Sequence, residues 1–423
     1  MKSRKPSPGD YVEISLVKRN YKGVLLEVPK SEKGIILLKL DSGYNIGFDR
    51  KKILDIKFLK KISSEKKDFE VKKDSKKPNI AMIITGGTIA SKYDSKTGGV
   101  DPMTEPKDLF KFYPKMFEKV NVVKVKVPFM KPSEDMGPSD WKKIARSAEN
   151  LLNDPNIKGI IITHGTDTLH YTSAALSFFL RDLKKPVVLT YSQRSIDRAS
   201  SDANLNLQCS ALAAISDIAE VMIVGHATTN DDYCNALPGT KTRKLHSSKR
   251  DAFKVVNGKP FAEVYTDRVN VISDYNIRNK GKTKIDLKFE KKVALVKVYP
   301  GQNPDILDYY VKKKYKGIVL EVFGLGHVPS KKWIKKIKEV AKKGIFFCAT
   351  AQTIYGRLDP FVYSSGRKLL ESEVIFLEDM LSETALVKLG WVLAHKKWIK
   401  NPEKVKEKMI QNISGELSNR LEK

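Results

Sequence analysis

The sequence predicts an α/β protein in which two doubly wound parallel-sheet domains follow a small β-barrel domain. Three observations lead to this prediction. Continuous apolar strand runs alternate with amphipathic helical patterns over residues 79–275, and a shorter series of the same kind occupies residues 291–423. Such alternation is typical of a parallel sheet covered by helices on both faces. The first 60 residues instead hold short β-rich runs separated by Gly, Asn, Asp and Ser, which are turn signals.

The barrel is predicted for residues 1–60. Its β-rich runs are short and closely spaced, as in small barrels. The segment that follows is rich in lysine and ends at Pro78, so we expect a solvated linker over residues 61–78. The four predicted strands are GDYVEI (9–14), YKGVLLEV (21–28), GIILLKL (34–40) and YNIGF (44–48).

The first α/β domain is predicted for residues 79–275, and the polar stretch 276–290 is predicted to be a crossover linker. Two segments have the apolar period of an amphipathic helix. They are 140–153 and 171–183. The apolar strand runs are 80–85, 120–127, 157–165, 185–192 and 218–225.

The second α/β domain is predicted for residues 291–423 and is smaller. Strand and helix patterns alternate in it as in the first domain. The sequence shows no short-period repeat. Its strand runs are 292–301, 316–329, 342–350 and 373–376, and its helices are 330–343 and 382–395.

The formal net charge of +29 raises the question of a nucleic-acid partner. Only 14 of the 78 basic residues are arginine, and base readout and bidentate phosphate contacts depend mainly on arginine. A general bias towards lysine explains the charge equally well. We therefore expect the isolated chain to bind nucleic acid weakly and without sequence preference.

Three further features bear on location. No apolar run approaches the ~18–20 residues that a membrane helix needs, and the basic N-terminus is not followed by the apolar core of a signal peptide. The three cysteines are far apart and lack zinc-ligand spacing. We therefore expect a cytoplasmic protein with no membrane segment, no disulfide framework and no metal.

Two predicted strands end in hydroxyl and glycine residues. The first ends in TGGTIAS (85–91) and the third in THGTDT (163–168). Ligands bind beyond the carboxyl ends of strands in open α/β sheets, and glycine lets a backbone approach a ligand. A threonine hydroxyl becomes a nucleophile when a base assists it. We expect His164 to be a packed, hydrogen-bonded residue rather than that base.

The paired motifs TGGTIAS and HGTDT resemble those of the bacterial-type L-asparaginase family. The resemblance covers roughly residues 79–400 and implies the asparaginase-like fold for both α/β domains. It also implies that Thr88 is the nucleophile and that Thr166 and Asp167 act with a lysine. The family's lysine is matched within TKTRKLHSSKRDAF (240–253), where Lys244 is the best placed and Lys241 is the alternative.

The same resemblance implies further site residues. PSEDMGPSDW (132–141) is similar to the family's substrate-binding loop, which gives Ser133 and Glu134 as substrate contacts. The family usually supplies a tyrosine from the loop after the first motif. Alignment on GGVDP (98–102) puts Val100 at that position, and Tyr93 is the other candidate.

Three segments resemble the D subunit family of archaeal glutamyl-tRNA(Gln) amidotransferases: the front segment GDYVEISLVKRNYKGVLLEV (9–28) with IILLKLDSGYNIGF (35–48), TRKLHSSKRDAF, and DMLSETALVKLGW (379–391). Free asparaginases do not need residues 1–78. This resemblance implies a glutamine amidohydrolase that passes ammonia to a partner, the E subunit of the amidotransferase. The partner would hold tRNA(Gln) and use ATP with Mg²⁺, so no cofactor is expected in this chain. It also implies two D and two E subunits with a D–D homodimer.

Two other functions remain open at this point. One is an autonomous L-asparaginase or glutaminase that carries an additional barrel. The other is a basic RNA-binding protein built on an inactive amidohydrolase scaffold. The barrel argues against the first, and the intact set Thr88, Thr166, Asp167 and Lys244 argues against the second.

Overall fold

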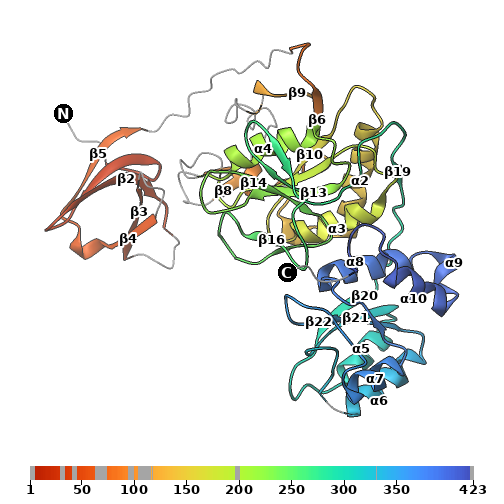
Figure 1. Ribbon diagram of the computed structural model, residues 1–423. Coiled ribbons are helices and arrows are strands. Elements are labelled where there is room, and N and C mark those ends of the chain that lie inside the picture. Colours follow the sequence, from red (N-terminus) through yellow and green to blue (C-terminus); the bar gives the residue numbers. More distant parts are fainter. Residues whose placement is uncertain are drawn as a thin grey trace.

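The computed structural model describes residues 5–28, 34–40, 45–61, 74–93, 100–102, 116, 118–195, 201–329 and 331–419. The chain folds into an N-terminal β domain and two α/β units (Figure 1).

The N-terminal β domain is a five-stranded antiparallel sheet with the order β4-β3-β2-β1-β5. Inward and outward side chains alternate along β1, and Val12, Ile14 and Leu38 are fully buried in the domain's own core. A small β-barrel domain was predicted for this region, and the structure shows a small, all-antiparallel β domain. Its strands are β1 (Asp10–Ser15), β2 (Asn20–Leu26), β3 (Ile35–Leu40), β4 (Asn45–Asp49) and β5 (Asp55–Lys61).

The first α/β unit is built on an eight-stranded mixed sheet with the order β18-β17-β14-β13-β12-β10-β6-β9. Strands β9, β6, β10, β12 and β13 are parallel, whereas β14, β17 and β18 are antiparallel. The prediction of a wholly parallel sheet is therefore wrong for this unit. Only residues 227–233 join β13 to β14, which is too short for the crossover that a parallel pair requires.

Helices cover both faces of this sheet. Side chains of α2 (Pro138–Leu152) and α3 (Leu169–Phe179) pack on one face, and α4 (Ala203–Ile215) packs on the other. The strands of the sheet are β6 (Asn79–Ile84), β9 (Asn121–Lys126), β10 (Ile160–Thr163), β12 (Val187–Thr190), β13 (Val221–His226), β14 (Cys234–Pro238), β17 (Ala262–Val264) and β18 (Val269–Val271).

Three short antiparallel pairs lie outside this sheet: β7 with β8, β15 with β16, and β11 with β19. The last pair ties the segment 276–290 to the end of α3, so this predicted linker contributes a strand of its own. The six strands are β7 (Ser91–Tyr93), β8 (Val100–Pro102), β11 (Leu180–Arg181), β15 (Thr242–Lys244), β16 (Phe253–Val255) and β19 (Lys284–Ile285).

The second α/β unit has a four-stranded parallel sheet with the order β20-β21-β22-β23, which confirms the parallel sheet predicted here. Its strands are β20 (Val293–Lys297), β21 (Gly317–Val322), β22 (Phe346–Ala351) and β23 (Ile375–Phe376). Its helices are α5 (Ile306–Lys312), α6 (Lys331–Ala341), α7 (Ser364–Leu370), α8 (Ser382–Leu393), α9 (Lys396–Ile399) and α10 (Pro402–Ile410).

Helix α8 joins the two α/β units. It packs against α3 of the first unit and against β20 and β21 of the second (Figure 1). Phe178 stacks on Trp391 across this junction, with ring centroids 5.9 Å apart. One apolar core therefore runs from the first sheet through α8 to the second sheet, and α8 packs against both units.

Among the residues that the structure describes, no helix combines the length and the apolar character needed to cross a membrane. Cys209, Cys234 and Cys348 are all buried and free.

Candidate active site

The two strand ends singled out in the sequence lie side by side. Strands β6 and β10 are parallel neighbours, and Ile84 pairs with Thr163 at their carboxyl ends. Because both chains leave the sheet at the same edge, the residues that follow enter the same region. The structure therefore brings the TGGT and HGTDT motifs together.

Glycines allow the closest approach between these motifs. Gly87 has a φ of +83°, and a Cβ added there would lie 2.4 Å from the backbone nitrogen of Gly165. Gly86 has a φ of +116°, and a Cβ added there would lie 2.5 Å from the carbonyl oxygen of Lys131. Both φ values favour glycine. The glycine pair thus serves a close backbone contact as well as a turn.

The two threonines of the first motif have different surroundings. Thr85 is fully buried, and its hydroxyl donates to the carbonyl oxygen of Thr163 at 2.7 Å. Thr88 is only partly buried and begins the short 3₁₀ helix η2 (Thr88–Ala90) directly after the turn at Gly87. The Thr85 hydroxyl is therefore committed to joining β6 to β10, whereas Thr88 stands at the edge where a ligand could approach.

Lys244 reaches the second motif from β15. Its Nζ atom donates to Thr166 Oγ1 at 2.8 Å and to Asp167 Oδ1 at 2.8 Å. The side chain of Lys244 is 10% exposed, whereas that of Asp167 is 65% exposed. The three residues form one hydrogen-bonded group that is closed on the lysine side and open to solvent on the carboxylate side.

Lys241 is engaged elsewhere. Its Nζ atom forms an ion pair with Asp379 of the second α/β unit, and both side chains are buried. Burial lowers the pKa of Lys241, and the Asp379 carboxylate opposes this effect. Of the two lysines considered for the catalytic role, Lys244 is the one that contacts Thr166 and Asp167.

Ser133 and Glu134 lie in the 3₁₀ helix η4 (Ser133–Asp135). Ser133 is buried against the second motif: a Cβ added at Gly165 would lie 2.8 Å from Ser133 Oγ, and the Thr168 hydroxyl donates to the Ser133 carbonyl at 2.7 Å. Glu134 is exposed. The predicted substrate loop is therefore adjacent to the Thr166 group, with Glu134 on its solvent side.

The two candidates for the family's tyrosine position face each other. Strand β7 leaves η2 directly and pairs with β8, so that Tyr93 lies opposite Val100 in the antiparallel register. Strand β8 packs back against η2. Both positions therefore lie on a hairpin next to Thr88. Their side chains and residues 94–99 fall outside what the structure describes.

His164 is a buried, hydrogen-bonded residue, as the sequence predicts. Its Nδ1 atom lies 2.7 Å from the Gly165 carbonyl and its Nε2 atom lies 2.8 Å from the Thr172 hydroxyl. Burial lowers the pKa of His164 to about 4. The ring is therefore neutral at pH 7 and supports the backbone just before Thr166.

A cluster of ionisable side chains next to Lys244 was not predicted from the sequence. Arg243 Nε lies 3.0 Å from Glu383 Oε1, and His170 Nε2 lies 3.8 Å from the same oxygen. Burial, then the positive charges of Arg243 and Lys244, lower the pKa of His170 to about 4. Glu383 belongs to the second α/β unit, 140 positions along the chain from Arg243, so the sequence carries no local signal for this group.

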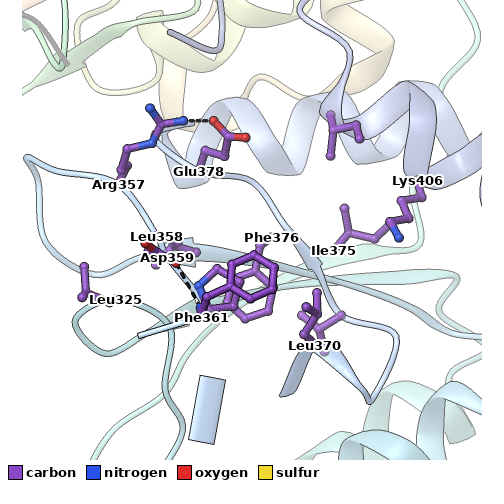
Figure 2. A pocket seen from close by; sticks show the side chains of 13 residues that line it. Leu325, Arg357, Leu358, Asp359, Phe361, Leu370, Ile375, Phe376, Glu378 and Lys406 are labelled. Carbon is purple, nitrogen blue, oxygen red and sulfur yellow. Dashed lines mark hydrogen bonds and ion pairs between the residues drawn. The ribbon is translucent and has the colours of Figure 1, made fainter. Parts of the chain in front are cut away.

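A separate cavity of about 540 Å³ lies in the second α/β unit. Figure 2 shows its aromatic side chains Phe361 and Phe376, with the Arg357–Glu378 ion pair at one side. None of the predicted site residues lines this cavity. Across the described residues, no cluster of three or more His, Cys, Asp or Glu side chains is arranged to hold a metal ion.

Three family models match the chain. The GatD N-terminal domain matches residues 7–59, the asparaginase N-terminal domain matches residues 79–276, and the glutaminase/asparaginase C-terminal domain matches residues 292–409.

Curated relatives match along nearly the whole chain. The glutamyl-tRNA(Gln) amidotransferase D subunit of Pyrococcus furiosus is 46% identical over 422 residues, covering 97% of this chain and 94% of that protein. The D subunit of Thermococcus kodakarensis is 44% identical with the same coverage. The chain belongs to the GatD family, the D subunits of glutamyl-tRNA(Gln) amidotransferases. The GatD protein of Methanococcus maripaludis is 41% identical and covers 97% of this chain and 98% of that protein.

Solved asparaginases share the fold of a large part of this GatD family member. The thermostable L-asparaginase from Thermococcus kodakarensis superposes with a TM-score of 0.71 at 30% identity, covering 81% of this chain and 100% of that protein. L-asparaginase I from Vibrio cholerae superposes with a TM-score of 0.67 at 27% identity, covering 81% and 99%.

Proposed function

We propose that this chain hydrolyses glutamine and supplies the ammonia for glutamyl-tRNA(Gln) amidation. The Thr88 hydroxyl attacks the side-chain amide carbon of glutamine and gives up its proton. The C–N bond then breaks, and the same proton passes to the leaving nitrogen, which departs as ammonia. Water then hydrolyses the ester on Thr88 to release glutamate. Splitting the reaction in two through a covalent intermediate lowers each barrier.

The observation that carries this proposal is the contact of Lys244 Nζ with both Thr166 and Asp167, at the sheet edge shared with Thr88. A lysine amine accepts a proton in its neutral form, and the neighbouring Thr166 hydroxyl is proposed to link it to the nucleophile. In this role Lys244 is the proton acceptor, Thr166 relays the proton, and Asp167 orients the amine.

Ser133 and Glu134 are proposed to bind the substrate. Ser133 lies against Gly165, directly before Thr166. The exposed Glu134 carboxylate is suited to the positively charged α-amino group of an amino-acid substrate.

The ammonia is proposed to pass to a partner, the E subunit of the amidotransferase, which holds tRNA(Gln) and activates the glutamyl group with ATP and Mg²⁺. Ammonia is mostly protonated at neutral pH, so a route shielded from water keeps it reactive. We propose an assembly of two D and two E subunits with a D–D homodimer, located in the cytoplasm. The relatives' name, which specifies a lettered subunit of an amidotransferase, supports the partner.

The test compares Thr88→Val with Thr85→Val, two substitutions that remove a hydroxyl and keep the shape of the side chain. Steady-state hydrolysis of glutamine and of asparagine is measured for each variant. Thr88→Val should lose more than about a thousandfold in kcat because it removes the nucleophile. Thr85→Val should keep most of the activity and lose stability, because it removes a buried hydrogen bond to Thr163. Equal activity in Thr88→Val and in the natural chain would refute the assignment.

A further inference from the structure

The segment that leads into Lys244 is held by the second α/β unit. We call residues 240–244 the lysine arm. The carbonyl oxygen of Thr240 accepts a hydrogen bond from the Thr384 hydroxyl at 2.8 Å, and Arg243 Nε lies 3.0 Å from Glu383 Oε1. Glu383 and Thr384 lie in the first turn of α8, which packs between the two units. The first turn of α8 therefore contacts the lysine arm near both of its ends.

A buried ion pair fastens the middle of the lysine arm. Lys241 Nζ pairs with one oxygen of Asp379, and the backbone N–H of Ser418 donates to the other oxygen at 3.1 Å. The side chains of Lys241 and Asp379 are 5% and 0% exposed. A buried charge needs such partners, because otherwise its desolvation is uncompensated. Any movement that separates Lys241 from Asp379 would leave a buried charge without a partner, so the pair favours one geometry.

The C-terminal segment 411–419 completes this support. Its Glu416 is fully buried and lies 2.5 Å from Lys388 Nζ of α8, which is also fully buried. The Ser414 carbonyl accepts from the Thr240 hydroxyl at 2.9 Å. The segment thus joins α8, Asp379 and the lysine arm into one network of buried polar contacts.

We infer that Asp379 is a positioning residue for amide hydrolysis: through Lys241 it fixes the lysine arm, so that Lys244 reaches Thr166 and Asp167. This inference rests on the proposed role of Lys244. A lysine side chain is long and flexible, and its own contacts are with one half-buried hydroxyl and one exposed carboxylate. The position of its backbone therefore decides whether the amine stays in reach. The second α/β unit, which contributes none of the proposed nucleophile and relay groups, sets that position.

The test is Asp379→Asn in the full chain, assayed for glutamine hydrolysis as the complex with the E subunit and glutamyl-tRNA. The substitution keeps the shape and removes the charge that holds Lys241. We expect kcat to fall by about tenfold to a hundredfold, the usual effect of misplacing a catalytic group by ~1 Å, with KM little changed. Unchanged kcat would overturn the inference.

Asp286→Asn is the matched control. Asp286 accepts a hydrogen bond from His395 Nε2 at 2.6 Å and joins the linker between the units to the end of α8. It makes no contact with the lysine arm in the described hydrogen bonds and ion pairs. The same substitution there should lower stability and leave kcat unchanged. A comparable drop in kcat for Asp286→Asn would show that destabilising the fold is enough to lower kcat, and would overturn the inference.

A double-mutant cycle with Lys244→Ala separates this inference from the proposed function. If Asp379 acts through Lys244, Asp379→Asn should cause no further loss in the Lys244→Ala background. Losses that multiply would show that Asp379 acts independently and would overturn the inference. Full activity of Lys244→Ala alone would instead refute the proposed role of Lys244. If Asp379→Asn does not fold, Lys241→Arg, which keeps the charge pair and changes its length, enters the same cycle with the same expectations.

Discussion

At the scale of single residues, the support of the site depends on two neutral histidines. His164 is fully buried between the Gly165 carbonyl and the Thr172 hydroxyl. His170 is buried beside Arg243 and Lys244. Burial lowers the pKa of each ring to about 4. In the unfolded chain a histidine has a pKa of about 6.5, so the unfolded state binds more protons between these two values.

This difference makes stability depend on pH. As the pH falls from about 6.5 to about 4, the unfolded chain gains protons that the folded chain does not, so the free energy of unfolding decreases by roughly 3 kcal/mol for each histidine. Denaturant unfolding of the natural chain at pH 7.5 and pH 4.5 measures the slope. His164→Gln and His170→Gln should each make the slope smaller. If both variants keep the full pH dependence, burial of these rings does not explain the acid sensitivity.

The choice between Lys241 and Lys244 shows what the sequence could not decide at this scale. Both lysines lie in one basic stretch of sequence, three positions apart. What separates them is Asp379, which comes 138 positions after Lys241 and removes that lysine from the site. No local pattern contains such a pairing. The environment of His164, in contrast, could be predicted, because the apolar strand before it already indicates burial.

At the scale of secondary structure elements, the turn between β6 and η2 is tightly constrained by its close contact with the second motif. Gly87→Ala should abolish hydrolysis, because the new Cβ would lie 2.4 Å from the nitrogen of Gly165 and would push the two motifs apart. Gly344→Ala is the matched control: its φ of +86° is nearly the same as the +83° of Gly87, but nothing lies within 4 Å of the added Cβ. It should cost only ~1–2 kcal/mol of backbone strain. Thermal unfolding and glutamine hydrolysis of both variants measure the two effects, and equal losses of activity would contradict this account.

Elements with a clear period could be predicted, and elements without one could not. Helix α6 has an apolar face and a lysine-rich face, and the predicted range 330–343 contains it. Helix α4 could not be predicted from periodicity. Nine of its 13 residues are buried, so no polar face marks the helical period. Strands β15 to β18 have only three residues each, too few to show alternation. One of these, β15, carries Lys244, so the site depends on an element that periodicity does not reveal.

At the scale of the whole molecule, the N-terminal β domain distinguishes this chain from free asparaginases. The two solved asparaginases match 81% of this chain and almost the whole of their own length. The GatD relative of Pyrococcus furiosus covers 97% of it, and the N-terminal domain model matches residues 7–59. An enzyme that only hydrolyses amides does not need the additional domain. Its presence is what we expect of a protein whose activity is coupled to a partner.

This coupling predicts that the chain alone hydrolyses glutamine slowly. The β7–β8 hairpin lies beside Thr88 and carries Tyr93 and Val100, the two candidates for the family's tyrosine position, so we expect the partner to act on this hairpin. A partner can activate the site only by binding the competent state more tightly, and a tenfold activation requires about 1.4 kcal/mol of such preference. Steady-state glutamine hydrolysis is measured for the chain alone, then with the E subunit, then with the E subunit and glutamyl-tRNA. We expect the rate to rise by about tenfold or more across the series. Full activity in the first condition, unchanged in the other two, would favour an autonomous asparaginase or glutaminase, because such an enzyme gains nothing from a partner's preference for one state of the hairpin.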